Sequence, residues 1–337
     1  MPENAKTVVI SDVHIGNGAS YSWFKSPYID DFIAMLSSIA ADKVVAELVL
    51  LGDIFDLWLY PINVPPWSVR QILDANPRVS AVLKQCVQRI PAVYYIKGNH
   101  DMEITEEDLA PLATSDDNHI QILSPEDYNC KYNSERHFEH GHAADMFNAA
   151  DTSPDTIGGY PLGYFITRLV ATSDASTVWK RFEETLESLG AVHRIMAPKA
   201  LAVRSMGSLF VEAIISALQE HAHLEGSTRI RFANPALDNQ FTIDDVKTHY
   251  SSLYGDWLRR CPDPEDFISA MLVSRRTDGL GRYAKKILAD PTVRVLVMGH
   301  THHTAIEGKY YNDGCWCGPS MSYVTIIGSE VKLVPCR

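Results

Sequence analysis

The chain has 337 residues, 46% of them hydrophobic, and a formal net charge of −12 at pH 7. This length and apolar content allow a large buried core, and the acidic balance argues against binding to long nucleic acid, which needs clustered lysine and arginine. No stretch is apolar over the length of a signal peptide or a membrane span. We therefore expect a globular, cytoplasmic protein without a transmembrane segment.

The first 140 residues alternate short apolar runs with amphipathic stretches. Apolar residues recur at helical spacing in residues 28–41 and 78–89, which predicts two helices. The short apolar runs around them predict buried strands, in the order of a βαβαβ unit. Strands are expected at residues 7–11, 48–51, 93–96, 119–123, 128–132 and 136–140.

Helical periodicity dominates residues 143–290, a stretch too long for a loop in a compact domain. We expect it to form a helical cap inserted into an α/β core that comprises residues 1–142 and 291–337. One predicted helix of the cap contains residues 246–258 and is capped by Thr242. Strands return at residues 293–298, 307–311, 323–327 and 331–334.

Short polar motifs follow the predicted strands at their carboxyl ends. They are Ser11-Asp12-Val13-His14, Gly52-Asp53-Ile54-Phe55-Asp56, Gly98-Asn99-His100-Asp101, His140-Gly141-His142 and Gly299-His300-Thr301-His302. Ligands of open α/β sheets bind beyond the carboxyl ends of strands, so these side chains can converge on one point. The glycines before Asp53, Asn99 and His300 suit sharp exits where the backbone approaches closely.

The motifs supply imidazoles, carboxylates and an amide, a mixed set of N and O donors that suits Mn, Zn, Fe or Co better than Mg or Ca. Residues two apart on an extended chain point to the same side, as Asp12 and His14 would. Asp53 has two carboxylate oxygens and can bridge two ions, which together activate a water and hold phosphoryl oxygens. The predicted metal ligands are Asp12, His14, Asp53, Asn99, His140, His300 and His302.

In this order, the motifs resemble the signature of the calcineurin-like metallophosphoesterase superfamily, over about the first 142 and last 45 residues. The resemblance implies a four-layer αββα sandwich of two mixed sheets, with a binuclear metal site that hydrolyses phosphate esters or anhydrides. It implies that Asp12, His14, Asp53 and His302 hold one metal, and that Asp53, Asn99, His140 and His300 hold the other. Asp53 would be the bridge.

The same resemblance implies that His100 protonates the leaving oxygen and that Asp101 orients its imidazole. A metal-bridging hydroxide would attack phosphorus in line. Mn is the expected metal, with Fe or Zn as alternatives. The expected substrate is a small phosphorylated molecule, selected by the cap.

A narrower resemblance, to the branch that contains UDP-2,3-diacylglucosamine hydrolase of lipid A synthesis, rests on residues 52–58, 140–141 and 311–316. Members of that branch carry Arg where this chain has His100, and their helical insertion is shorter. This pyrophosphohydrolase activity is one alternative function. A nucleotide phosphodiesterase and a non-catalytic protein-binding scaffold are the others, although a scaffold need not keep a complete ligand set.

Several residues near the motifs are expected to have other roles. Asp56 is interpreted as a structural hydrogen-bonding group, and Trp58 and Trp316 as core or rim aromatics. The cysteines lack paired spacing, and neither Cys315 nor Cys317 is expected to be a metal ligand. Basic residues of the cap would form solvated helix faces or clamp a non-reacting phosphate. They are Arg194, Lys199, Arg204, Arg275, Arg276, Arg282, Lys285 and Lys286.

Overall fold

The computed structural model describes residues 5–115, 118–132, 135–153, 156–173, 200–260, 279–318 and 321–336. The chain divides into two compact units. The first comprises Met1–Leu57, Trp67–Ala144 and Val273–Arg337, and the second comprises Trp58–Pro66 and Asp145–Leu272. Among the described residues, no helix combines the length and the apolar character that a membrane crossing needs.

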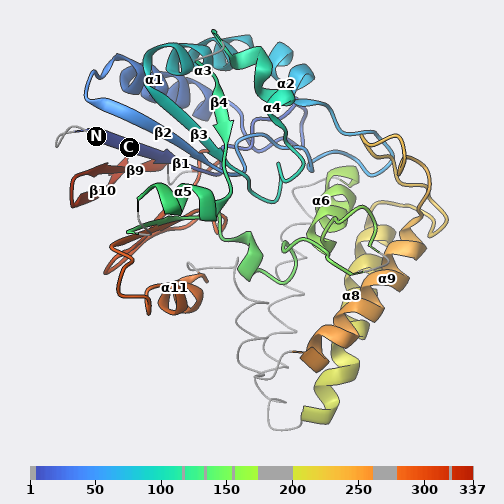
Figure 1. Cartoon of the computed structure of the whole chain (residues 1–337). Coiled ribbons are helices and arrows are strands. Elements are labelled where there is room, and N and C mark those ends of the chain that lie inside the picture. Colours follow the sequence, from blue (N-terminus) through green and yellow to red (C-terminus); the bar gives the residue numbers. More distant parts are fainter. Residues whose placement is uncertain are drawn as a thin grey trace. The chain divides into compact units, whose positions relative to one another are not determined.

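A mixed six-stranded sheet forms the centre of the first unit, in the order β10-β9-β1-β2-β3-β4. The strands β1 (Lys6–Ile10), β2 (Val45–Leu51), β3 (Ala92–Ile96) and β4 (Ile120–Ile122) are parallel (Figure 1). At the other edge, β9 (Ser322–Ile327) runs antiparallel to both β1 and β10 (Glu330–Pro335). The parallel strands bring the motifs that follow β1, β2 and β3 to one edge of the sheet.

A second, four-stranded sheet has the order β5-β6-β8-β7. It contains β5 (Arg136–Phe138), β6 (Val295–Met298), β7 (Thr304–Glu307) and β8 (Tyr310–Asp313). The prediction of one strand at residues 307–311 is wrong, because the chain turns at Gly308 and Lys309 between antiparallel β7 and β8. Gly308 has φ of 63°, a left-handed conformation that glycine adopts without steric cost.

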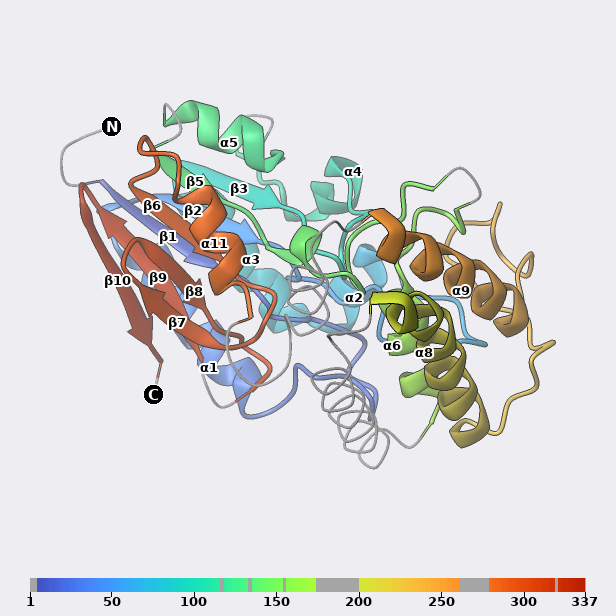
Figure 2. The ribbon, with the colours of Figure 1, turned by 90° about the horizontal axis from the view of Figure 1, so that it is seen from below.

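Alternating side chains of β1 enter two different cores. Val8 packs in the cluster that joins the sheet to α1 (Tyr28–Ala41) and α3 (Pro77–Arg89), whereas Val9 packs with Val297 of the second sheet. On the far side of the second sheet, Leu296 packs against Ala284 of α11 (Gly281–Ile287), and Figure 2 shows α11 beside these strands. The predicted αββα layering is confirmed.

Local capping explains the helices of the first unit, including those that the periodicity missed. The helix predicted at residues 28–41 is confirmed, and α3 begins at Pro77, one residue before its predicted start. The unpredicted α2 (Val69–Ala75) begins with a capping box between Ser68 and Gln71. The short helices α4 (Glu106–Leu109), η1 (Ala110–Leu112) and η2 (His142–Ala144) complete this unit with α5 (Pro125–Lys131).

The strand predicted at residues 128–132 is wrong, because α5 occupies this segment. The backbone N–H of Asp127 donates to the Ser124 hydroxyl over 3.0 Å, and Pro125 is at the first helical turn. A capped start with proline in the first turn favours a helix. The aromatic residue of this helix, Tyr128, packs inward and is completely buried.

The second unit contains the helices α6 (Leu162–Thr172), α8 (Ala200–His221) and α9 (Ile243–Arg260), of which α8 and α9 run side by side (Figure 2). Thr242 caps α9 as predicted, because its hydroxyl accepts from the Asp245 N–H over 3.2 Å. Arg168 of α6 is fully buried and donates to the carbonyl oxygens of Tyr60 and Pro61 over 3.2 and 2.8 Å. These bonds attach residues 58–66 to the helical unit.

The two compact units differ from the predicted division in two places. Residues 58–66 belong to the helical unit, and residues 273–290, including α11, belong to the unit with the sheets. Arg282, Lys285 and Lys286 are therefore outside the helical unit. Arg194, Lys199, Arg275 and Arg276 lie outside the described residues, as does the side chain of Arg204.

Candidate metal centre

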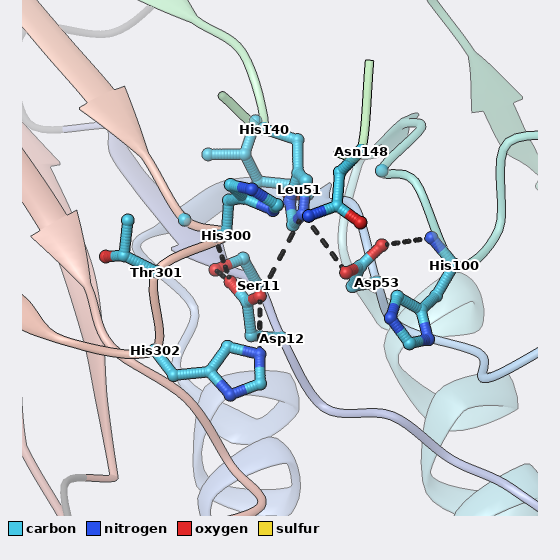
Figure 3. A network of polar contacts seen from close by, with 12 residues as sticks. Ser11, Asp12, Leu51, Asp53, His100, His140, Asn148, His300, Thr301 and His302 are labelled. Carbon is cyan, nitrogen blue, oxygen red and sulfur yellow. Dashed lines mark hydrogen bonds and ion pairs between the residues drawn. The ribbon is translucent and has the colours of Figure 1, made fainter. Parts of the chain in front are cut away.

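The motif residues come together where five strands of the first unit end. Asp12 and His14 follow β1, Asp53 follows β2, and Asn99 and His100 follow β3. From the second sheet, His140 follows β5, while His300 and His302 follow β6. Figure 3 shows Asp12, Asp53, His140, His300 and His302 gathered around one point. All seven predicted ligands are buried except His302, whose side chain is 30% exposed.

The backbone of this site is strained at the residues that carry the chemistry. Five non-glycine residues have positive φ, between 53° and 71°, a conformation that costs about 1–3 kcal/mol each. They are Asp12, His14, Asp53, His300 and His302. The sequence predicted sharp backbone turns at the ends of the strands only at the neighbouring glycines. Such strain persists where the surrounding fold fixes the backbone, which is common at functional sites.

The glycines of the motifs are needed because side chains of the site lie against them. A Cβ atom at Gly98 would be 2.2 Å from Oδ1 of Asp53, and one at Gly299 would be 2.3 Å from Oδ2 of Asp12. Both separations are far below van der Waals contact. Any side chain at these positions would displace a carboxylate of the site.

One group of donor atoms lies around Asp12, His14 and His302. The two Nε2 atoms of His14 and His302 are 3.0 Å apart, and Nε2 of His302 is 3.2 Å from Oδ1 of Asp12. Nε2 of His14 lies 4.0 Å from the same oxygen and 3.8 Å from Oδ2 of Asp53. Atoms bound about 2.1 Å from one ion are separated by such distances.

A second group lies around Asp53, His140 and His300, whose donor atoms are all within 4.8 Å of one another. Nε2 of His140 is 3.2 Å from Oδ2 of Asp53. Nδ1 of His140 lies 2.8 Å from the Leu51 carbonyl oxygen, to which only a protonated Nδ1 can donate. In a neutral ring the lone pair is then on Nε2, which faces the carboxylates. Asn99 is buried in the loop after β3.

The donor set fits a pair of metal ions. Oδ1 of Asp12 and Nε2 of His140 are buried, and in the part of the chain that the structure describes their 3.2 Å contacts, with His302 and Asp53, are ion pairs within the site that lack hydrogen-bond geometry. Buried polar atoms without hydrogen-bond partners are costly, and a cation would satisfy both. Imidazole nitrogen and carboxylate oxygen are donors for Mn, Fe, Co and Zn.

The carboxylates and imidazoles that face one another in the site shift one another's pKa values. Burial opposes the charge of Asp12, but His140 and His302 lower the pKa of its carboxyl to about 2. Burial likewise opposes protonation of His140, but Asp53 and Asp12 raise its pKa to about 10. The pKa of His302 is raised to about 9 by Asp12, again against burial. A metal must displace these protons, so its binding strengthens as pH rises.

A further carboxylate outside the ligand set holds Asp12 in place. The Ser11 hydroxyl lies within hydrogen-bond distance of Oδ2 of Asp12 and, at 2.6 Å, of Oδ1 of Asp313. The backbone N–H of Ser11 donates to Asp313 over 2.7 Å, and the His300 N–H donates to Oδ2 of Asp12 over 2.8 Å. Oδ1 of Asp12 is thereby left to face the other donors.

The ring of His100 contacts a second aspartate of the site, Asp56. Nδ1 of His100 is 3.0 Å from Oδ1 of Asp56, whose Oδ2 is 3.4 Å from Nδ1 of His14. Asp101 instead accepts from the backbone N–H groups of Ile54 and Gly98, over 2.8 and 2.7 Å, and from the Tyr95 hydroxyl. The expected role of Asp101 in orienting the His100 ring stays a prediction beside these contacts. Both carboxylates are buried, and the sequence alone could not tell which reaches the imidazole.

Trp23 was missed by sequence reasoning because it belongs to none of the motifs. Its ring centroid lies 4.8 Å from that of His14, 5.6 Å from that of His100 and 5.7 Å from that of His302. Trp58 and Trp316 are instead fully buried, as expected of core aromatics. His142 lies outside the donor groups, with its ring centroid 5.6 Å from that of His140.

A four-layer αββα sandwich whose strands end at adjoining histidine and carboxylate donors is typical of metal-dependent hydrolases. Residues 5–304 match the family described as calcineurin-like phosphoesterase, and the chain belongs to that family. Its members hydrolyse phosphate esters with the help of metal ions, and the histidine and aspartate groups described above could hold such ions. A search of curated proteins found no match.

Proposed function

We propose that this chain hydrolyses a phosphate ester or anhydride of a small phosphorylated molecule with two metal ions. The observation that carries the proposal is that Asp53 belongs to two groups of donor atoms, one with His14 and His100 and one with His140 and His300. In this assignment one metal is held by Asp12, His14, Asp53 and His302. The other is held by Asp53, Asn99, His140 and His300.

When bound, the ions would polarise the phosphoryl oxygens and lower the pKa of a water. A side chain of the protein, His100, supplies the general acid that protonates the leaving group. Burial opposes protonation of His100, but Asp56 and Asp53 raise its pKa, which keeps a proton available for the leaving oxygen. The backbone N–H of His100 donates to Oδ1 of Asp53 over 2.8 Å. The loop that carries His100, the proposed acid, therefore also orients Asp53, the proposed bridging carboxylate.

A substrate screen tests this proposal. The chain, loaded separately with Mn²⁺, Fe²⁺ and Zn²⁺, is assayed against phosphomonoesters, diesters, nucleotides and nucleotide-sugar pyrophosphates, and bound metal is measured by mass spectrometry. We expect hydrolysis of at least one class, two metal ions per chain, and loss of both in Asp53→Ala. Activity in Asp53→Ala equal to that of the natural chain would refute the assignment.

Trp23 favours nucleotides as a second candidate substrate class. Its ring is 77 residues from His100 in sequence but lies beside it, where the leaving group would depart. An indole next to the acid can stack on the planar base or the sugar of a nucleoside leaving group, a contact worth about 1–3 kcal/mol. Trp23→Ala should therefore raise KM for a nucleotide about 5- to 100-fold and leave KM for an alkyl phosphate unchanged. Equal effects on both substrates would exclude base stacking.

A further inference from the structure

The imidazole ring of His302 has a different neighbour at each of its two nitrogens. Nδ1 is 3.8 Å from Sγ of Cys317, whereas Nε2 is 3.0 Å from Nε2 of His14 and 3.2 Å from Oδ1 of Asp12. The two nitrogens of one ring point in different directions and cannot both bind one ion. The sulfur of Cys317 therefore faces the ring of His302 and not the ion that its Nε2 would bind.

The proton of the His302 ring decides the direction of the contact with sulfur. A neutral imidazole carries one proton, and only the nitrogen without it has the lone pair that a metal needs. If the Cys317 thiol donated to Nδ1, the ring proton would be on Nε2 and would point toward Asp12 and His14. If Nδ1–H donates to the sulfur, Nε2 is free to bind a metal. Only the second arrangement is compatible with His302 as a ligand.

Two other histidines of the metal centre are arranged in the same way. Nδ1 of His140 is 2.8 Å from the Leu51 carbonyl oxygen, and Nδ1 of His14 is 3.4 Å from Oδ2 of Asp56, while Nε2 of each ring faces the donor groups. Ligating histidines generally donate their second N–H to such an acceptor, which orients the ring. Beside His302, a sulfur takes the place of the oxygen.

The loop that carries Cys317 is attached to the metal centre. The backbone N–H of Trp316 donates to the carbonyl oxygen of Asp12 over 2.9 Å, and the Trp316 ring is fully buried in the core. The same loop thus holds Asp12 through the backbone and reaches His302 through the sulfur. Because the His302 side chain is 30% exposed, less of its surface is packed against the protein than in the buried histidines, and this contact matters more for its orientation.

We propose that Cys317 is a positioning residue: its sulfur accepts the Nδ1–H of His302 and so presents Nε2 to the ion held with Asp12 and His14. The proposal rests on the metal centre of the proposed function. Sulfur is a weak acceptor compared with a carbonyl or carboxylate oxygen, but partners of this kind typically contribute 10- to 100-fold to metal affinity.

Two substitutions of the same shape test this role. Asn and Leu are nearly isosteric, but only Asn offers an acceptor to Nδ1 of His302. The Zn²⁺ affinity of the full chain is measured by competition with a chelator, and Cys336→Ala, at a free cysteine of similar exposure, is the control. We expect Cys317→Leu to bind one of its two ions about 10- to 100-fold more weakly. Cys317→Asn and Cys336→Ala should bind both ions as the natural chain does.

Nuclear magnetic resonance of the histidine ring protons detects the hydrogen bond itself. In the Zn²⁺-loaded natural chain and in Cys317→Asn, the Nδ1–H proton of His302 should be protected from exchange with water. In Cys317→Leu it should exchange faster, because it loses its acceptor in a side chain that is 30% exposed. A purely structural role of Cys317 would not separate two variants of the same shape.

The outcomes distinguish this proposal from the proposed function. Equal Zn²⁺ affinity, or equal exchange, in Cys317→Leu and Cys317→Asn would overturn the positioning role and leave the metal centre intact. An intense near-ultraviolet charge-transfer band in the Co²⁺-loaded natural chain would place sulfur on the ion, which also overturns it. Failure of the natural chain to bind Zn²⁺ or Co²⁺ would refute both this proposal and the proposed function.

Discussion

Two buried aspartates of the site, Asp56 and Asp101, have different roles because of what surrounds each one. Asp56 faces the imidazoles of His14 and His100, so its charge favours protonated His100 and fixes its ring. Asp101 accepts two backbone N–H groups, from the loops after β2 and β3, and the Tyr95 hydroxyl. It therefore holds together the loops that carry Asp53 and Asn99. The proposed acid depends on Asp56, and the shape of the site depends on Asp101.

Removal of His100 tests its proposed role as the general acid. A general acid contributes on the order of 10²- to 10⁴-fold when the leaving group is a poor one. The variant His100→Asn should lose activity in this range on an alkyl ester and much less on a nitrophenyl ester, whose leaving group is stable as an anion. Metal content, measured by mass spectrometry, should be unchanged. Because His100 also lies within 4.8 Å of donors of His14 and Asp53, loss of metal would instead make it a ligand.

Removal of the Asp56 charge should resemble removal of His100. We expect Asp56→Asn to lower kcat on the alkyl ester more than on the nitrophenyl ester, because the His100 ring loses its hydrogen-bond partner and the charge that keeps it protonated. Asp101→Asn is the matched control and should lower activity on both esters to the same degree. Steady-state kinetics on the two esters distinguishes these patterns. The reverse pattern would favour the role that the sequence predicts for Asp101.

At the scale of the elements, the hydrophobic pattern predicted strands and helices best where each face of the element packs against a single layer. The runs at β1, β2 and β3 and the stripe of α1 are read correctly, since burial alone sets their patterns. The pattern failed at α5, where the cap at Ser124 outweighs strand-like side chains, and at Gly308, where a turn divides the segment predicted as one strand. Contacts between distant loops, such as those of Asp56 and Trp23 with His100, have no local signal.

A buried carboxylate joins β2 to α5 and can be tested by unfolding. Glu47 is 2% exposed and accepts from the hydroxyls of Thr7, Tyr128 and Tyr132 over 2.7 to 3.0 Å. Arg136 lies 3.8 Å away. Glu47→Ala removes the acceptor of the three hydroxyls and the carboxylate beside Arg136, and removal of one member of a buried pair costs about 3–5 kcal/mol.

Urea unfolding followed by circular dichroism measures this cost. Glu330→Ala is the control, because its ion pair with Lys332 is exposed and worth less than about 1 kcal/mol. A loss of the same size in both variants would mean that the Glu47 network contributes nothing beyond a surface pair. The network lies at the opposite end of β2 from Asp53, so metal content should not change.

At the scale of the whole molecule, the proposed ligands all belong to one of the two units. The centre draws its donors from the ends of five strands in two sheets, so a bound ion crosslinks segments that are hundreds of residues apart in sequence. The unfolded chain offers no such arrangement. Metal binding should therefore stabilise the sandwich unit by mass action.

The size of this effect follows from the free metal concentration. An ion present at 100 times its dissociation constant adds about 2.7 kcal/mol, which corresponds to a rise of roughly 5–10 °C in the midpoint of a domain of 150–250 residues. Hydrogen exchange read by mass spectrometry locates the gain, and we expect slower exchange in β1, β2 and β6 on adding Zn²⁺ or Mn²⁺. The variant Asp53→Ala, which lacks the proposed bridge, should show neither the higher midpoint nor the slower exchange. A rise of the same size in Asp53→Ala would place the stabilising ion elsewhere, and a rise in the natural chain without protection of these strands would mean that the ion does not bind at their ends.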